Sequence, residues 1–168
     1  MKVVYGIQVA YHFIPFIIQN RYSVVWPRIV SFFQALRVAE PDTSVGAAGF
    51  CWGGKYAMLL AKHHHHHDVE GASLVDAAFA AHPSFVKLPD DVQGLEQPLS
   101  IAIGTKDLVM NVAMVEKLKG LLGKETGAAS EVVVFEDAKH GAWALGILPC
   151  GYPVTELICR LCCSRGPW

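Results

Sequence analysis

The sequence predicts a single α/β domain in which helices flank a mostly parallel β-sheet. Two observations lead to this prediction. First, short apolar segments alternate with segments of helical spacing, which is the order that parallel strands and their crossover helices require. Second, 52% of the 168 residues are hydrophobic and only 17% are charged. This composition suits one buried core and excludes a disordered chain.

Charge and cysteine content narrow the classes of partner and compartment. The chain has 14 basic and 15 acidic residues, so it has no overall attraction for nucleic acid or anionic lipid. Its 5 cysteines are an odd number, and no secretory signal is evident. This pattern favours a reducing compartment, and we expect a cytoplasmic protein. The sequence leaves the oligomeric state open.

The first 40 residues are expected to form a helical N-terminal segment. Residues 3–18 are apolar, but this run is shorter than the roughly 20 residues of a membrane span. We therefore predict packing against the domain, or a lid, rather than a stable span. A helix is predicted over 27–37, where Pro27 suits a first turn. Its apolar face is formed by Trp26, Ile29, Val30, Phe33 and Leu36.

The next elements alternate between strand and helix. Residues 44–50 are small and apolar and predict a short buried strand. Residues 55–62 are rich in Ala and Leu and predict a helix. Apolar residues bounded by turn formers predict two further strands, over 74–81 and 99–103.

The last two elements of the core follow the same order. A helix is predicted over 111–122, with Asn111 as its N-cap and Gly123 as its stop signal. A strand is predicted over 131–135, and its three consecutive valines indicate burial on both faces. Such a sheet is expected to carry helices on both faces.

We expect one domain over 1–168, made of the N-terminal segment 1–40, a catalytic core over 44–141 and a divergent tail over 142–168. The five consecutive histidines at 63–67 predict a low-complexity surface loop. The cysteines crowded near Cys159 in the tail lack a second well-spaced pair or a nearby histidine, which disfavours a zinc site.

Three reactive side chains come shortly after predicted strands. Cys51 follows the first core strand, Asp107 follows the third after a short turn, and His140 follows the last. In parallel sheets, functional sites lie at the carboxyl ends of the strands. The order of nucleophile, acid and base is that of an α/β-hydrolase triad. We therefore predict a catalytic triad of Cys51, Asp107 and His140.

The residues around Cys51 form a nucleophile-elbow pattern with sulfur in place of the hydroxyl. Gly49 and Gly53 stand two positions before and two after Cys51, where crowding at the turn is expected to require glycine. The positive end of the following helix favours the thiolate. The backbone N–H of Trp52 is expected to stabilise an oxyanion.

Each of these residues also has a structural interpretation. Cys51 could be an inert buried thiol, Asp107 a turn residue and His140 a surface histidine. His82 also follows a strand, so it could line the pocket, although a histidine at a strand end is more often structural.

The motif stretches resemble the dienelactone hydrolase family, also called carboxymethylenebutenolidases, in its fungal form. The resemblance covers roughly residues 14–141, and the elbow with Cys followed by Trp is its most specific part. The supporting stretches are Gly49-Phe50-Cys51-Trp52-Gly53-Gly54-Lys55, Ala81-His82-Pro83-Ser84-Phe85, Ile103-Gly104-Thr105-Lys106-Asp107 and Ala138-Lys139-His140-Gly141.

The resemblance implies an α/β-hydrolase-type sheet and hydrolysis of lactones or small esters. It implies a Cys-Asp-His triad at Cys51, Asp107 and His140, with no metal and no organic cofactor. Members of the family carry several strands before the elbow, whereas the first 40 residues here predict mainly helix. We therefore expect a shortened chain whose sheet is incomplete at the N-terminal strands and whose sequence diverges after Gly141.

Two other functions remain open from the sequence. The chain could be a catalytically impaired fragment, or a non-catalytic binding remnant of the fold. It could also be a thiol redox protein that uses Cys51. The redox function is less favoured because no resolving cysteine lies nearby in sequence.

Overall fold

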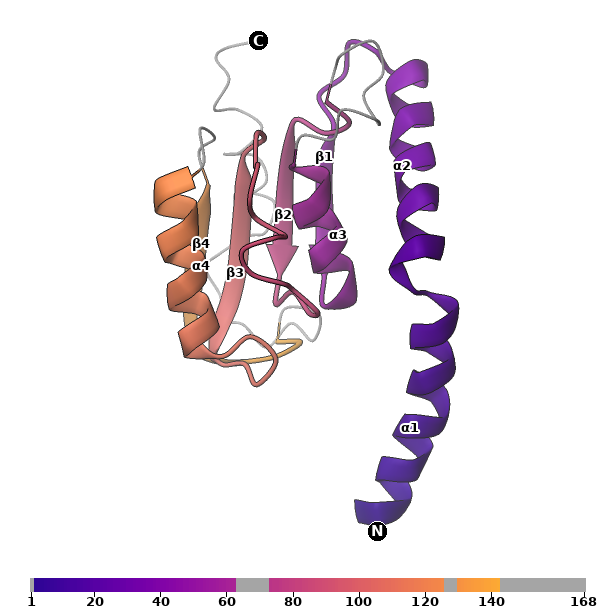
Figure 1. Ribbon diagram of the computed structural model, residues 1–168, viewed down its shortest axis with the longest axis vertical. Coiled ribbons are helices and arrows are strands. Elements are labelled where there is room, and N and C mark those ends of the chain that lie inside the picture. The colour runs from indigo at the N-terminus through magenta and orange to yellow at the C-terminus, as the bar shows by residue number, and fades with distance from the viewer. Residues whose placement is uncertain (1, 63–72, 126–129, 143–168) are drawn as a thin grey trace.

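Four parallel strands of the described residues form one sheet (Figure 1). The computed structural model describes residues 2–62, 73–125 and 130–142. The sheet has the order β1-β2-β3-β4, and the predicted α/β fold with a parallel sheet is confirmed. The strands are β1 (Gly46–Phe50), β2 (Ala77–Ala81), β3 (Leu99–Lys106) and β4 (Glu131–Lys139).

The helices mostly follow the predicted order but differ at their ends. They are α1 (Lys2–Gln19), α2 (Tyr22–Ala39), α3 (Trp52–Leu60) and α4 (Val112–Glu125). Pro27 lies inside α2 rather than in its first turn, because the helix starts at Tyr22. The prediction that Gly123 ends a helix was wrong, since α4 continues to Glu125. A glycine in an exposed helix costs only about 1 kcal/mol, which neighbouring helical residues can offset.

Both crossover helices cover the same face of the sheet. Met58 of α3 and Leu118 of α4 share one buried cluster with Leu99 and Ile101 of β3. The prediction of helices on both faces is therefore wrong for the described part of the chain. Right-handed crossovers between strands that advance in one direction place every helix on one side. Helix α2 packs on this side too, with Trp26 beside Tyr56 of α3.

Strand β4 lies at an edge of the sheet, and this position corrects the predicted burial of its valines. Val132 and Val133 are half-buried and Val134 is exposed. An edge strand has a neighbour on one side only, so an apolar run does not guarantee burial on both faces. The strand also runs to Lys139, which places His140 immediately after its end.

Helix α1 extends away from the sheet (Figure 1). Several of its large apolar side chains are exposed, namely Tyr11, Phe13, Ile14, Phe16 and Ile18. Within the described residues, no helix combines the length and hydropathy that a membrane crossing requires. The predictions for the tail from 143 onward, for its cysteines and for the histidines at 63–67 lie outside the described residues.

The turn between β1 and α3 explains one of the two elbow glycines. A Cβ atom on Gly49 would overlap the carbonyl group of Gly53, so glycine is required at 49. A Cβ atom on Gly53 would meet nothing within 4 Å. Crowding therefore does not require a glycine at 53, contrary to the prediction. The backbone carbonyl of Gly53 is the group that lies close to Gly49, and the lack of a side chain at Gly53 has no part in this contact.

Substituting these two glycines should have opposite consequences for stability. Gly49→Ala is expected to lower the free energy of unfolding by about 1–3 kcal/mol, because the added methyl forces the β1–α3 turn apart. Gly53→Ala is the matched control, and it should leave stability unchanged or slightly raised, since alanine favours the helix. Urea denaturation followed by circular dichroism measures both. Equal unfolding midpoints for the two variants would contradict the close packing at Gly49.

Candidate active site

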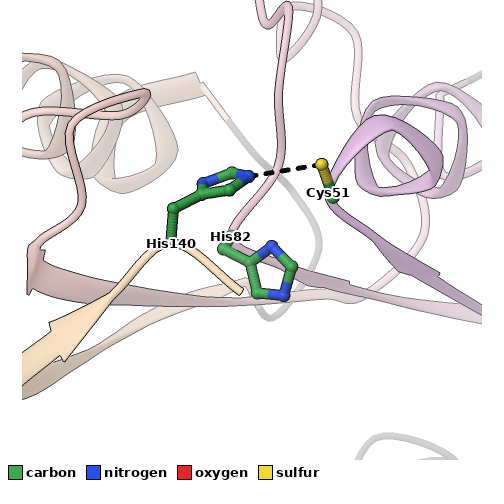
Figure 2. A group of neighbouring side chains, drawn as sticks. All are labelled: Cys51, His82 and His140. Carbon is green, nitrogen blue, oxygen red and sulfur yellow. Dashed lines mark hydrogen bonds between the residues drawn. The ribbon is translucent and has the colours of Figure 1, made fainter. Parts of the chain in front are cut away.

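The carboxyl edge of the sheet brings three sequence-distant side chains together. Cys51 follows β1, Asp107 follows β3 and His140 follows β4. The Nε2 atom of His140 lies 3.2 Å from Sγ of Cys51, the contact drawn in Figure 2. Its Nδ1 atom lies 2.9 Å from Oδ2 of Asp107. The imidazole therefore bridges the thiol and the carboxylate.

The backbone of Cys51 is held in an unfavourable conformation by its neighbours. Its φ angle is 50°, in a region where a residue other than glycine costs about 1–3 kcal/mol. The Cys51 N–H donates to the carbonyl of Ala81 at 3.0 Å. The Cys51 carbonyl accepts hydrogen bonds from the N–H groups of Gly54 at 3.1 Å and Ser84 at 2.9 Å. These bonds fix the thiol at the start of α3.

Asp107 is oriented by its own loop. Its carboxylate is buried, and Oδ1 accepts hydrogen bonds from the N–H groups of Val109 at 2.7 Å and Met110 at 3.1 Å. The other oxygen, Oδ2, is left facing His140. Asp107 therefore has two functions. Its Oδ1 atom stabilises the turn, and its Oδ2 atom binds the imidazole of His140.

Hydrogen bonds around the thiol favour its ionised form. Burial alone would raise the pKa of Cys51. Hydrogen bonds from Ser84, His140 and the Trp52 N–H, together with the charge of His140, outweigh burial and lower that pKa. For His140, burial alone would lower the pKa, but hydrogen bonds to Cys51 and Asp107 and their charges raise it. The two opposite shifts favour a thiolate–imidazolium pair.

Ser84 is a member of the site that the sequence analysis did not single out. Its hydroxyl oxygen lies 3.4 Å from Sγ of Cys51 and 3.3 Å from Nε2 of His140. The residue is buried and lies in the loop after β2. One feature of the sequence could have identified Ser84 as a site residue. It lies two residues after His82, in a stretch that follows a predicted strand.

His82 lies beside these residues but is fully buried, with 2% of its surface exposed. Its ring packs edge-to-face against the ring of His140, with 4.8 Å between the centroids. Neither of its ring nitrogens hydrogen-bonds to another described residue. Burial, followed by the charge of His140, lowers the pKa of His82, so the ring favours its neutral form.

A pocket of about 260 Å³ opens next to the elbow. It lies between the α1–α2 junction, helix α3 and Phe85, and its walls are mostly apolar. Trp52 is one of its lining residues, and the indole ring also packs against Tyr56 and Phe16. The residue after the thiol therefore has its side chain in this pocket, while its N–H points to the sulfur.

Removing the Ser84 hydroxyl should make the thiol harder to ionise. In Ser84→Ala the thiolate loses one hydrogen-bond donor, so the pKa of Cys51 should rise and the alkylation profile should move to higher pH. Alkylation by iodoacetamide at pH 7 should be roughly threefold to tenfold slower, as for the loss of one hydrogen bond. Mass spectrometry of the Cys51 peptide, recorded against pH, measures this.

The matched control is Ser100→Ala. Ser100 is also buried, but its hydroxyl donates to Glu131 at 3.0 Å, in the first part of β3. Its loss should leave the alkylation profile unchanged. If both serine variants showed the wild-type profile, the hydrogen bond from Ser84 would not contribute to ionising the thiol.

Comparison with known proteins matches most of the chain to one family. A sequence model of the dienelactone hydrolase family matches residues 19–144. Hydrolase pyvD of Aspergillus violaceofuscus is 28% identical over 115 residues, which cover 68% of this chain and 42% of that protein. Hydrolase tropI of Talaromyces stipitatus is 27% identical over 129 residues, 77% of this chain and 46% of that protein. The chain therefore spans less than half the length of these fungal relatives.

A solved structure supports the fold. The Pyrococcus furiosus esterase Pf2001 matches with a TM-score of 0.53 and 17% sequence identity. The match covers 71% of this chain and 55% of the esterase. At this identity the likeness concerns the arrangement of strands and helices alone.

Proposed function

The chain belongs to the dienelactone hydrolase family, and we propose that it hydrolyses lactones or small esters with Cys51 as nucleophile, His140 as base and Asp107 as orienting acid. The observation that carries this proposal is the pair of contacts made by one imidazole. His140 lies 3.2 Å from the sulfur of Cys51 and 2.9 Å from the carboxylate of Asp107. This is the mutual geometry that nucleophile, base and orienting group need.

In the first half of the reaction, the Cys51 thiolate attacks the substrate carbonyl carbon. The carbonyl oxygen gains the negative charge, and the Trp52 N–H at the start of α3 is the donor proposed to stabilise it. The tetrahedral intermediate then collapses to a thioester. The alkoxide that leaves takes a proton from the His140 imidazolium. In a lactone this alcohol stays attached to the acyl group.

In the second half, His140 acts as a base on water. The water attacks the thioester carbonyl, and its proton goes to Nε2 of His140 while Asp107 keeps Nδ1 protonated. Collapse of the second intermediate releases the carboxylic acid and restores the thiolate–imidazolium pair. The cycle needs no redox partner and no organic cofactor, and it uses a small-molecule substrate.

The proposed chemistry requires Cys51 as a free thiol. A reducing compartment keeps it in this state, so we propose that the protein works in the cytoplasm. The mostly apolar pocket beside Trp52 and Phe85 is the proposed place for the acyl or ring portion of the substrate.

The direct test is hydrolysis of p-nitrophenyl acetate by the wild-type chain and by Cys51→Ala. A rate that depends on Cys51 supports the enzyme. Equal rates would favour the alternative of a catalytically impaired or non-catalytic remnant of the fold.

A further inference from the structure

Cys51, His82 and His140 form a cluster of three side chains of metal-binding type. One ligand atom from each residue lies within 4.8 Å of the other two. Figure 2 shows the His82 ring beside the pair formed by Cys51 and His140. The three residues follow three different strands, β1, β2 and β4. The sheet therefore holds them in place at its carboxyl edge.

His82 is the member of this cluster that the proposed hydrolysis does not use. The ring is fully buried, yet neither nitrogen has a hydrogen-bond partner among the described residues. A buried polar group without a partner is costly, and such groups in native structures are rare enough to need an explanation. A neutral imidazole with a free nitrogen is the form that binds a metal ion.

We propose that Cys51, His82 and His140 together form a binding site for a soft divalent cation of the Zn²⁺ type, which inhibits hydrolysis. Thiolate and imidazole are the ligands that zinc prefers. In a tetrahedral zinc site, sulfur and nitrogen ligands lie about 3.3–3.6 Å apart. The sulfur of Cys51 and Nε2 of His140, 3.2 Å apart, are already close to this range, and the remaining separations, within 4.8 Å, need the His82 ring to approach by about 1 Å.

Asp107 would orient His140 as a metal ligand. It accepts a hydrogen bond from Nδ1 of His140 at 2.9 Å, so Nε2 is the nitrogen that faces the metal. A carboxylate on the far side of a metal-binding histidine is the usual arrangement in zinc proteins. Three protein ligands also leave a fourth position for water.

Binding and hydrolysis exclude each other at this site, and this part of the proposal rests on the proposed function. On binding, the proton that Cys51 and His140 share in the thiolate–imidazolium pair is released to solvent, and the thiolate sulfur donates a lone pair to the cation. The deprotonated Nε2 atom of His140 also donates its lone pair to the cation, so neither group is available for attack or proton transfer. The ion is thus a reversible inhibitor rather than a cofactor of the reaction.

The test begins by removing competing histidines. The five histidines at 63–67 are replaced by serine in every protein used, because adjacent imidazoles also bind divalent metals. Co²⁺ is added as a spectroscopic probe, and the thiolate-to-cobalt charge-transfer band is recorded. Inhibition of p-nitrophenyl acetate hydrolysis by Zn²⁺ is measured separately, relative to the activity of each protein in chelator.

Two substitutions at His82 remove its nitrogens in different ways. His82→Phe keeps the ring that packs against His140, and His82→Asn suits the positive φ of 37° at this position. For both variants we expect the inhibitory Zn²⁺ concentration to rise at least about tenfold. Cys51→Ser should lose the cobalt band that Cys51 contributes. Wild-type inhibition in a folded His82 variant would overturn the proposal.

A measurement on the unsubstituted site does not depend on the folding of any variant. The ring nitrogen resonances of His82, in a long-range ¹⁵N–¹H spectrum, should shift when Zn²⁺ is added. Unchanged His82 resonances at saturating Zn²⁺ would overturn the proposal. The cobalt and nuclear magnetic resonance signals do not require turnover. A chain that binds the ion but hydrolyses nothing would therefore contradict the proposed function and leave the metal site supported.

Discussion

Replacing Cys51 with alanine is expected to lower kcat/KM for ester hydrolysis by about 10⁴- to 10⁶-fold, as the loss of a nucleophile does in a well-studied protease. The physical reason is that no thioester can form without the sulfur. Water would then have to attack the ester directly, helped only by His140 and the backbone donor at Trp52. The structure supports a large effect because the thiol has a direct imidazole contact and a lowered pKa.

Release of p-nitrophenol from p-nitrophenyl acetate measures the Cys51 effect, with thermal unfolding as the check on folding. Cys51→Ser is the matched variant. It keeps a side chain of similar shape, but its hydroxyl ionises far less readily than a thiol, so its rate should also be strongly reduced. Mass spectrometry of the wild-type chain during turnover should show an acyl group on the Cys51 peptide. The proposed nucleophile would be contradicted if the Cys51→Ala chain became acylated, or if it hydrolysed the ester as fast as the wild-type chain.

Asp107→Asn is expected to lower kcat by about 10⁴-fold, as the equivalent change does in a serine protease triad. An amide NH₂ facing Nδ1 of His140 favours the imidazole tautomer that carries its proton on Nε2. That proton then points at the sulfur of Cys51, so the ring can no longer accept one. The stabilising negative charge beside the imidazolium is also lost.

The fold should survive the change at Asp107. An asparagine keeps one oxygen that can accept the hydrogen bonds from the N–H groups of Val109 and Met110. Asp137→Asn is the control, because Asp137 is exposed and pairs with Lys106 near the same end of the sheet. We expect wild-type activity from the control. Wild-type activity from Asp107→Asn would show that the carboxylate does not orient His140.

Local sequence patterns were sufficient for the elements and their order. Runs of small and apolar residues predicted all four strands of the described sheet, although only β2 and the first part of β3 are buried on both faces. Asn111 was predicted as a cap, and its Oδ1 accepts a hydrogen bond from the Met114 N–H at 3.1 Å. Element ends were less well predicted, since Gly123 and Pro27 are tolerated inside longer helices.

The candidate site was predicted in part for a related reason. Strand ends can be recognised in a sequence, and the parallel arrangement implies that they meet at one edge. Cys51, Asp107 and His140 were found in this way. Ser84 and the contacts of His82 were not, because each depends on how the loop after β2 turns back over Cys51. No periodicity in the sequence reports that path.

The sequence by itself determined the class of fold, the strand ends and the order of the reactive residues, because these depend on local composition and on the chain order. Only the tertiary structure decided which side chains touch. It placed all the described crossover helices on one face, left β4 at an edge and buried His82 against His140. These features arise from the lateral order of the strands, which is set by contacts between residues far apart in the chain.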